Sequence, residues 1–496
     1  MIKKRIREAL LAAVFFLMLA AAVAGVSRIV ERKQSRRQFE PFWDRPQELD
    51  VLFLGDSHMV NGVFPMELWR DYGLTGYNLS CYGNTLPVTY WIMMNALDYA
   101  QPKLIVLGVK DVEKSYKVSG SSGDLHNALD CFPLTLTKAR ALEDLMDDPN
   151  ATDDEGHRYA DIKWEYYFTL GKYHGRWSEL STSDFRYTLN CQKGAEMAVR
   201  VSKTREYDII DDMMDESGWG FSYLRRIIEE CEGRGIDLLL VHIPHPADET
   251  AQQAGNTVAS IAEEYGLNYI DFVNMDQVVD YSVDCFDSFS HLNPAGARKV
   301  TDYLGRFITE HYPVADHRGE AAYSQWDADY DAYADYKLSL IRQEEELKDV
   351  LMLLHDAHFS VCLSIDAGSA VYKDEQMLTL LQNIAREHVY EEDAYSKWSN
   401  ALFPLEQLDE AAALGERYFL LVDRGTGTLL EHTGDSGTLE RETSFGVVRY
   451  DAQSGGMRIG QDGAQGTETT VVSGEYGVQV LVVDERTHEV AASLRF

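Results

Sequence analysis

Apolar residues form short continuous runs that alternate with stretches of helical periodicity up to about residue 311. The runs at 50–54, 103–107 and 238–243 border glycine or proline, as strands buried on both faces of a parallel sheet often do. Two weaker strands are predicted at 77–79 and 269–272. Helical spacing marks the segments at 65–72, 88–99, 221–231, 258–265 and 294–311. This alternation predicts an α/β sandwich with a mostly parallel sheet.

The pattern is interrupted at residues 115–206, which are acidic and rich in aromatic side chains. We interpret this segment as a large helical and loop-rich insertion that caps the sheet. After the sandwich, a long helix is predicted at 330–354, then a strand at 359–365 and a helix at 374–384. The last part has β patterning with glycine turns, and its strands are predicted at 419–422, 446–450, 469–472 and 478–483.

These changes divide the chain into four regions. The N-terminal region is 1–45, the α/β domain with its insertion is 46–315, a helical or α+β segment is 316–415, and a β-rich accessory domain is 416–496. A chain of 496 residues is too long for one ordinary core, which agrees with such a division.

The N-terminal region has the composition of a membrane anchor. Basic residues at 3–7 precede an uncharged stretch at 9–26, which is near the shortest helix that crosses the hydrocarbon. Positive charge before the span favours a cytoplasmic N-terminus, so we expect the body to be extracytoplasmic and held by a single-pass helix. Cleavage remains an alternative, because Ala22-Val23-Ala24 fits a signal-peptide site and would give a secreted protein.

The formal net charge of −35 argues against a nucleic-acid partner, because such proteins present basic surfaces to phosphate. The six cysteines are widely spaced without a C-x-x-C pair, so free thiols and disulfides both stay open. His242 and His245 alone do not make a metal site. We therefore predict neither a metal nor a cofactor.

Two separate loops carry residues suited to nucleophilic catalysis. Gly55-Asp56-Ser57-His58 follows the first predicted strand, and in open α/β sheets that end faces the crevice where ligands bind. Asp287 and His291 precede the helix predicted at 294–311. A serine on one loop, with a histidine and carboxylates on another, fits a nucleophile, its base and an orienting acid.

These motifs resemble the SGNH, or GDSL-type, hydrolase family over about residues 46–312. The resemblance is strongest to its extracytoplasmic branch, which includes the D-alanyl transfer protein of teichoic acid synthesis and alginate O-acetylation proteins. It implies a three-layer sandwich, Ser57 as nucleophile and His291 as base. The family places aspartate three residues before histidine, where this chain has Ser288. One extra loop residue would make Asp287 the orienting acid, which we expect, and Asp284 is the alternative.

The resemblance also implies an oxyanion hole that includes Gly83 and Asn84, in the segment that matches the second family block. The third block normally supplies an asparagine amide, but Lys110 stands there and cannot replace it. The hole would then use either the Asn84 amide or the backbone N–H groups of Ser57 and Gly83.

Three further residues are candidates for substrate binding. His58 neighbours the nucleophile, where it would contact substrate or pack on the next turn. Arg176 and Trp177 lie in an aromatic segment that would line a sugar-binding cleft or form the insertion's own core.

The function expected from the resemblance is O-acyl transfer or O-acyl ester hydrolysis on a cell-envelope glycan through an acyl-serine intermediate. An acyl carrier is a second possible substrate, and a membrane-bound O-acyltransferase is the implied partner. The alternative is a catalytically degenerate glycan-binding or scaffold protein of the same fold. Residues 416–496 resemble a GG domain, which implies a glycan- or partner-binding accessory module.

Overall fold

The computed structural model describes residues 2–44, 49–205, 207–275, 278–287, 291–385, 405–460, 467–468 and 476–496. The first part of the chain forms α1 (Ile2–Val30), α2 (Gln34–Asp44), β1 (Val51–Leu54), α3 (Ser57–Gly62), α4 (Pro65–Tyr72), β2 (Gly76–Asn78), α5 (Leu86–Ala96) and β3 (Leu104–Gly108). The insertion forms α6 (Ser122–Leu129), α7 (Leu136–Leu145), α8 (Tyr159–Ile162), η1 (Lys163–Tyr166), α9 (Leu170–Tyr173), η2 (Arg176–Ser178) and α10 (Thr182–Phe185). The sandwich then continues with α11 (Trp219–Arg234), β4 (Asp237–His242), α12 (Glu249–Tyr265), β5 (Asn268–Asp271), η3 (Phe272–Asn274) and α13 (Pro294–His311).

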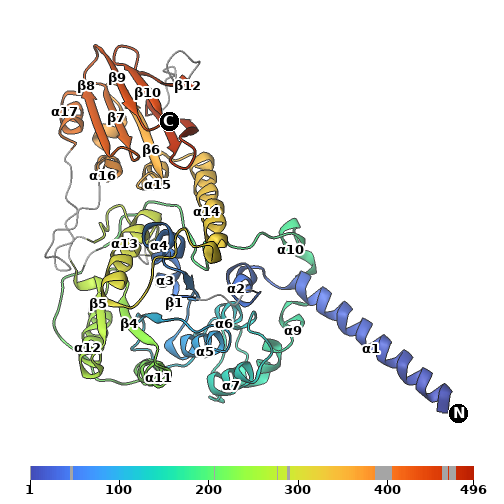
Figure 1. Cartoon of the computed structure of the whole chain (residues 1–496). Coiled ribbons are helices and arrows are strands. Elements are labelled where there is room, and N and C mark those ends of the chain that lie inside the picture. The colour runs from blue at the N-terminus through green and yellow to red at the C-terminus, as the bar shows by residue number, and fades with distance from the viewer. Residues whose placement is uncertain are drawn as a thin grey trace.

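The first sheet is parallel throughout and has the strand order β2-β1-β3-β4-β5. Alternate strand residues face opposite helical layers. Leu52 and Leu54 share a core with α5, α11 and α12, whereas Val51 and Phe53 share one with α3, α4 and α13. The result is a three-layer α/β sandwich (Figure 1). The topological switch point lies between β1 and β3, where open sheets of this order bind ligands.

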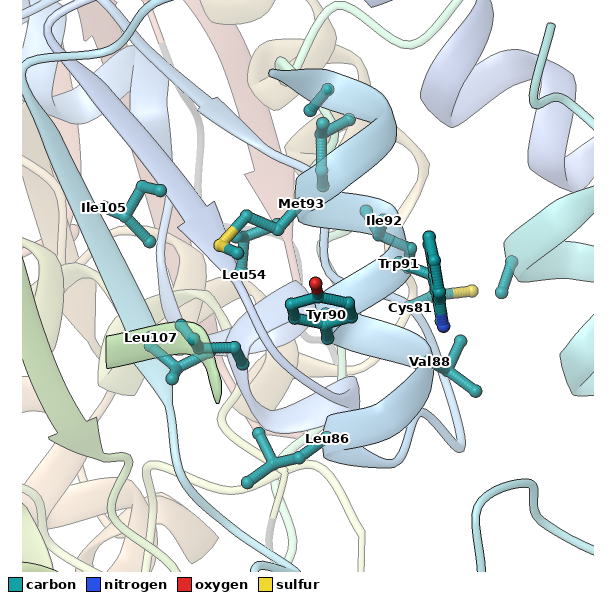
Figure 2. Packing of buried hydrophobic residues seen from close by; sticks show 14 of the residues in the cluster. Leu54, Cys81, Leu86, Val88, Tyr90, Trp91, Ile92, Met93, Ile105 and Leu107 are labelled. Atoms are coloured by element: carbon teal, nitrogen blue, oxygen red, sulfur yellow. The ribbon is translucent and has the colours of Figure 1, made fainter. Parts of the chain in front are cut away.

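The helix α5 shows how one of these layers is held. It begins at a Thr85 cap and is buried on nearly every side, because the sheet covers one face and the insertion covers another. Figure 2 shows Leu54, Ile105 and Leu107 from β1 and β3 directed toward this helix. Such dense burial on a central helix fixes the loop that precedes it.

The remainder of the chain begins with η4 (Ala321–Tyr323), α14 (Ser324–Gln343), α15 (Leu347–Leu353), β6 (Phe359–Ile365), η5 (Ala370–Lys373), α16 (Glu375–Ala385) and α17 (Glu406–Leu414). It ends with β7 (Tyr418–Asp423), β8 (Thr428–Thr433), β9 (Thr438–Thr443), β10 (Gly446–Asp451), β11 (Gly456–Gly460), β12 (Thr467–Glu468), β13 (Val478–Asp484) and β14 (Glu489–Arg495). The strand predicted at 469–472 lies outside the described residues.

One antiparallel sheet joins strands from both sides of the predicted boundary at residue 415. It has the order β14-β13-β6-β7-β8, so β6 is the central strand. Val361, Leu363 and Ile365 pack under α15, α16 and α17, while Cys362 faces the smaller sheet β12-β11-β10-β9. The single helix predicted at 330–354 is wrong, because residues 344–346 separate α14 from α15.

The helix α1 projects away from the body (Figure 1). Residues 4–30 are long and apolar enough to cross a membrane and have no buried share, and a signal sequence would satisfy the same test. All six cysteines are free, so the structure has no disulfide to support the exported location.

Candidate active site

Ser57 lies at the carboxyl end of β1 and opens the short helix α3. Asp56 is the N-cap of that helix and accepts a hydrogen bond from the His58 N–H at 3.1 Å. Gly55 is required at the turn, since an added Cβ would stand 2.6 Å from Cγ of Met59 and 3.3 Å from Cα of Gly108. The close approach of two strand ends therefore presents the serine at the sheet edge.

His291 belongs to a loop that is fastened on both sides. The Phe286 N–H donates to the His291 carbonyl at 2.9 Å, and Cys285 forms isolated bridges with Ser202 and Leu292. Asn293 then caps α13 through its side chain, which accepts from the N–H groups of the first helical turn. These contacts bring the imidazole to the carboxyl end of the sheet.

The structure places Ser57, His291 and Asp287 in one hydrogen-bonded chain. Ser57 Oγ lies 2.7 Å from His291 Nε2, and His291 Nδ1 lies 2.7 Å from Asp287 Oδ2. The His291 backbone N–H also donates to Asp287 at 3.1 Å, which fixes the carboxylate on the same loop. The side chains of His291 and Asp287 keep 15% and 26% of their surface exposed, so the chain of contacts reaches solvent.

The other candidate acid, Asp284, has a different role. Its carboxylate lies 2.6 Å from Lys299 Nζ, and both side chains are fully buried. It also accepts from the Asp280 N–H, which shapes the preceding turn. Of the two acids weighed from the sequence, Asp287 is therefore the one that contacts the His291 ring.

A second histidine lies behind His291. The ring of His58 is 4.4 Å from the His291 ring, centroid to centroid, and 5.1 Å from that of His245. Its Nδ1 lies 3.1 Å from Asp56 Oδ2. His58 is only 3% exposed, so it supports the His291 ring from within the fold rather than lining an open cleft.

Burial and charge set the ionisation of this layer. Burial lowers the pKa of His58, although Asp56 opposes the shift, and burial also lowers the pKa of His245 well below its usual value. The Asp56 pKa is depressed: its burial is outweighed by His58 and by Lys110, whose Nζ lies 3.7 Å away. The layer under the triad is thus a carboxylate with neutral imidazoles and one ammonium.

The predicted oxyanion residues lie on a loop held beside the nucleophile. The Asn84 amide donates to the Gly55 carbonyl at 3.2 Å, and the Cys81 N–H donates to the same carbonyl at 3.3 Å. In the described part of the chain, the backbone N–H groups of Ser57 and Gly83 donate to no protein acceptor. Of the two alternatives from the sequence, this arrangement favours backbone donors.

Arg176 and Trp177 are placed elsewhere. Arg176 donates to the Val30 carbonyl at the end of α1 and to Asp184 at 3.2 Å, while the Trp177 side chain is 56% exposed. No described contact joins either residue to the triad.

Glu196 is a neighbour of the site that the sequence patterns do not reveal. It accepts a hydrogen bond from the Tyr82 hydroxyl at 3.1 Å, beside the oxyanion loop. A lone glutamate so far along the chain carries no motif that reveals this.

A cavity borders the site through His245. Its volume is about 180 Å³, and its walls include Tyr207, Ile209, Phe272 and Tyr281. His245 lies in the wall of this cavity and also against the His58 ring.

Comparison with known proteins adds little to this geometry. No protein-family model matches the chain, and no curated protein matches its sequence. Among solved structures, a candidate acylhydrolase from Bacteroides fragilis aligns with 56% of this chain and 98% of its own, at 9% identity and a TM-score of 0.27. That similarity is too low to carry an argument. The chain is a mixed α/β protein with a parallel five-stranded sheet and an N-terminal apolar helix.

Proposed function

We propose that this protein is a membrane-anchored, extracytoplasmic serine hydrolase or O-acyltransferase of the SGNH type that acts on ester bonds of a cell-envelope glycan. The observation that carries the proposal is the continuous contact from Ser57 through His291 to Asp287 at an exposed sheet edge. The chain of contacts has the order of groups that activates a serine hydroxyl.

The proposed reaction has two steps. Ser57 Oγ attacks the ester carbonyl carbon while its proton passes to His291 Nε2, and Asp287 stabilises the imidazolium that forms. The N–H groups of Ser57 and Gly83 would stabilise the oxyanion. Collapse of this intermediate breaks the ester bond, and the departing alcohol takes the proton from His291. Water or a sugar hydroxyl then attacks the acyl-serine by the same route in reverse.

A fluorophosphonate probe tests the nucleophile directly. We expect covalent labelling of the full-length protein that is lost in Ser57→Ala and kept in Ser339→Ala, a serine on the distant helix α14. The melting temperature of each variant serves as the folding control. Labelling that persists in a folded Ser57→Ala variant would contradict the proposal.

A degenerate scaffold protein is the second candidate, and Lys110 motivates it. The ammonium lies 3.1 Å from Asp111 and 3.7 Å from Asp56, so it is held in carboxylate contacts where a family member has an amide donor. A folded wild-type protein that resists the probe, yet binds surface glycan, would favour the scaffold.

A further inference from the structure

A polar cavity lies where α1 leaves the body. Its volume is about 610 Å³, and its basic wall consists of Arg32, Lys33, Arg37 and Arg176. A second cavity of about 540 Å³ shares Arg32 and Arg176 with it. Four cations therefore surround one cavity in a protein whose net charge is −35, and they differ in whether they already have partners.

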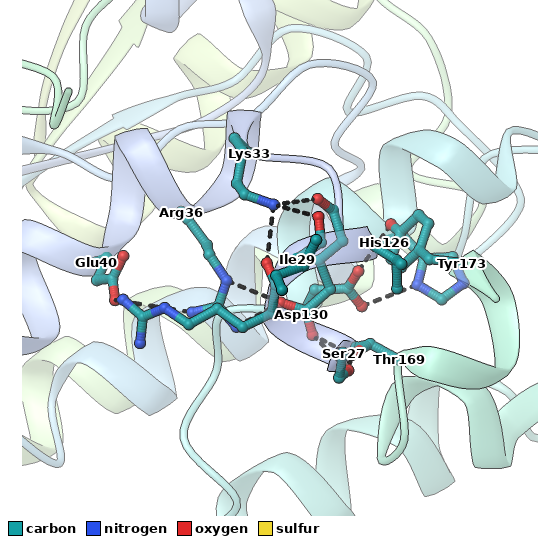
Figure 3. A network of polar contacts seen from close by, with 12 residues as sticks. Ser27, Ile29, Lys33, Arg36, Glu40, His126, Asp130, Thr169 and Tyr173 are labelled. Carbon is teal, nitrogen blue, oxygen red and sulfur yellow. Dashed lines mark hydrogen bonds and ion pairs between the residues drawn. The ribbon is translucent and has the colours of Figure 1, made fainter. Parts of the chain in front are cut away.

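Two of the four cations hold the end of α1. Lys33 Nζ donates to the carbonyls of Arg28, Ile29 and Glu31 at 2.8, 3.0 and 2.7 Å, which satisfies the last turn of the helix (Figure 3). Arg176 donates to the Val30 carbonyl and to Asp184. These two side chains are therefore committed to the junction between α1 and the insertion.

The other two cations, Arg32 and Arg37, remain available. Within the described residues, neither side chain forms a hydrogen bond or an ion pair, and the buried Nε of Arg37 has no acceptor. The carboxylates nearby have hydrogen-bond partners of their own. Asp184 is held by Arg176 and by the Ser181 N–H, and Glu196 accepts from Tyr82. Burial raises the pKa of Glu196, although Tyr82 and the charge of Arg37 oppose the shift, so a protonated or weakly held Glu196 leaves the Arg37 guanidinium without a hydrogen-bonded acceptor. The cavity thus offers two guanidinium groups with free donors to an anion.

The location indicates which anion. The helix α1 ends at Val30, four residues or about 6 Å beyond the uncharged stretch 9–26, and the headgroup layer extends roughly 5–8 Å beyond the hydrocarbon. Arg32, two residues further on, would therefore lie at the outer edge of that layer. Polar contacts hold this junction together, because Glu31 contacts Ser27, Arg36 and Thr169. Exposed Trp177 and Phe185 flank the same junction, as aromatic side chains do at membrane interfaces.

We infer that Arg32 and Arg37 bind the phosphate group of an anionic lipid headgroup in the outer leaflet. This inference rests on the anchoring part of the proposed function and not on its catalytic part. The same cavity includes Glu196, which contacts Tyr82 of the oxyanion loop, so a lipid held here would lie close to that loop.

The test uses the full-length protein in neutral detergent, on a Ser57→Ala background so that catalysis has no influence. The probe is dihexanoyl phosphatidylglycerol, and its binding is measured by titration calorimetry. We expect saturable binding that weakens at least about tenfold in Arg32→Gln/Arg37→Gln, since each guanidinium loses charge-assisted hydrogen bonds. The exposed single variant Arg32→Gln, which disturbs no described contact, should weaken binding in the same direction.

The matched control is Arg186→Gln, an exposed arginine at the end of α10 and outside the cavity. Unchanged binding in this variant supports a specific site, whereas equal weakening in all variants would mean diffuse attraction and overturn the inference. A titration with inorganic phosphate distinguishes a lipid headgroup from a soluble anion as the ligand. Phosphate that binds as tightly as the lipid would assign the cavity to a soluble anion and overturn the lipid assignment.

Discussion

Two groups of histidine and carboxylate side chains in this protein look similar in composition and differ in what surrounds them. The Ser57 cluster consists of Asp56, Ser57, His58, Asp287 and His291. The Lys337 cluster consists of Glu67, Tyr333, Lys337, Asp356 and His358, and it joins α4 to α14. Both contain a histidine paired with an aspartate on its own loop.

The Lys337 cluster is closed. Its ammonium contacts Glu67 at 2.7 Å and also contacts Asp356, and the side chains of Lys337, Glu67 and Asp356 are at most 5% exposed. Glu67, Asp356 and His358 are close enough to hold a metal ion, but Lys337 already contacts all three. The Ser57 cluster instead keeps a neutral nucleophile and an imidazole at the surface. Access, rather than a histidine–aspartate contact, separates a reactive site from a structural one.

The largest expected effect is a loss of activity in the Ser57 cluster that leaves the stability of the protein unchanged. We predict that His291→Ala reduces ester hydrolysis by about 10⁵- to 10⁶-fold, because no other base among the described residues contacts Ser57. Turnover of a p-nitrophenyl ester measures the loss, and the melting temperature should stay within a few degrees. His311→Ala, on the exposed end of α13, is the matched control. A folded His291→Ala variant with near-normal turnover would remove His291 from the mechanism.

Substitutions of the two candidate acids should also differ, one in its effect on activity and the other in its effect on stability. Asp287→Asn is expected to lower turnover by about 10⁴-fold, because an amide no longer holds the His291 tautomer or stabilises its charge. Asp284→Asn instead weakens the buried contact with Lys299 and should lower the melting temperature first. The reverse result, with activity lost in a stable Asp284→Asn variant, would reassign the orienting acid.

The Lys337 cluster should respond through stability. Lys337→Met leaves Glu67 and Asp356 buried without their shared cation, which costs about 3–5 kcal/mol. We expect the melting temperature to fall by roughly 10 °C while the folded protein still labels with the fluorophosphonate probe. Conversion of half-buried Lys348 to Met, on α15, controls for loss of a lysine charge that is paired near the surface, with Asp374. An equal loss of stability in that control would contradict the special role of the closed cluster.

Elements with strong local signals could be predicted from the sequence. The helices at 65–72 and 294–311 have the predicted bounds, because Pro65 and Pro294 occupy their first turns. The strand at 359–365 is equally clear, since every residue of it is buried. The strands β8 and β9 were not predicted, because neither has an apolar pattern. Residues of β8 are only partly buried, and those of β9 are mostly exposed.

The candidate site likewise contains residues that local motifs predict and contacts that only the fold creates. Ser57 and His291 follow from two motifs with a chemical reason behind each, and the structure places them 2.7 Å apart. The contacts of Lys110 with Asp56 and of Glu196 with Tyr82 arise only when distant segments fold together. The Lys337 cluster is of this second kind, since α4, α14 and the loop before β6 each contribute to it.

The smallest expected effect is a dependence of stability on pH, which tests the difference between the Lys337 cluster and the Ser57 cluster. Burial lowers the pKa of His358 to about 4, with Lys337 acting in the same direction and Asp356 opposing it; Arg70 and Glu67 also face this ring. Between pH 6.5 and pH 4.5 the unfolded chain therefore takes up a proton that the folded protein refuses, and stability falls as the pH falls. Glu67, whose pKa is lowered to about 2, adds to this fall only near pH 4.5, where its carboxylate begins to take up a proton in the unfolded chain but not in the folded protein.

We expect this histidine to contribute a slope on the order of 1 kcal/mol per pH unit. His358→Gln should flatten the fall in melting temperature between pH 6.5 and pH 4.5, and Ser57→Ala should leave the fall unchanged. Buried His58 and His245 have lowered pKa values as well, so some pH dependence should survive in His358→Gln. A variant that loses stability as steeply as the wild type would show that His358 takes up its proton in the folded state. The Lys337 cluster would then not be the closed unit that distinguishes it from the Ser57 cluster.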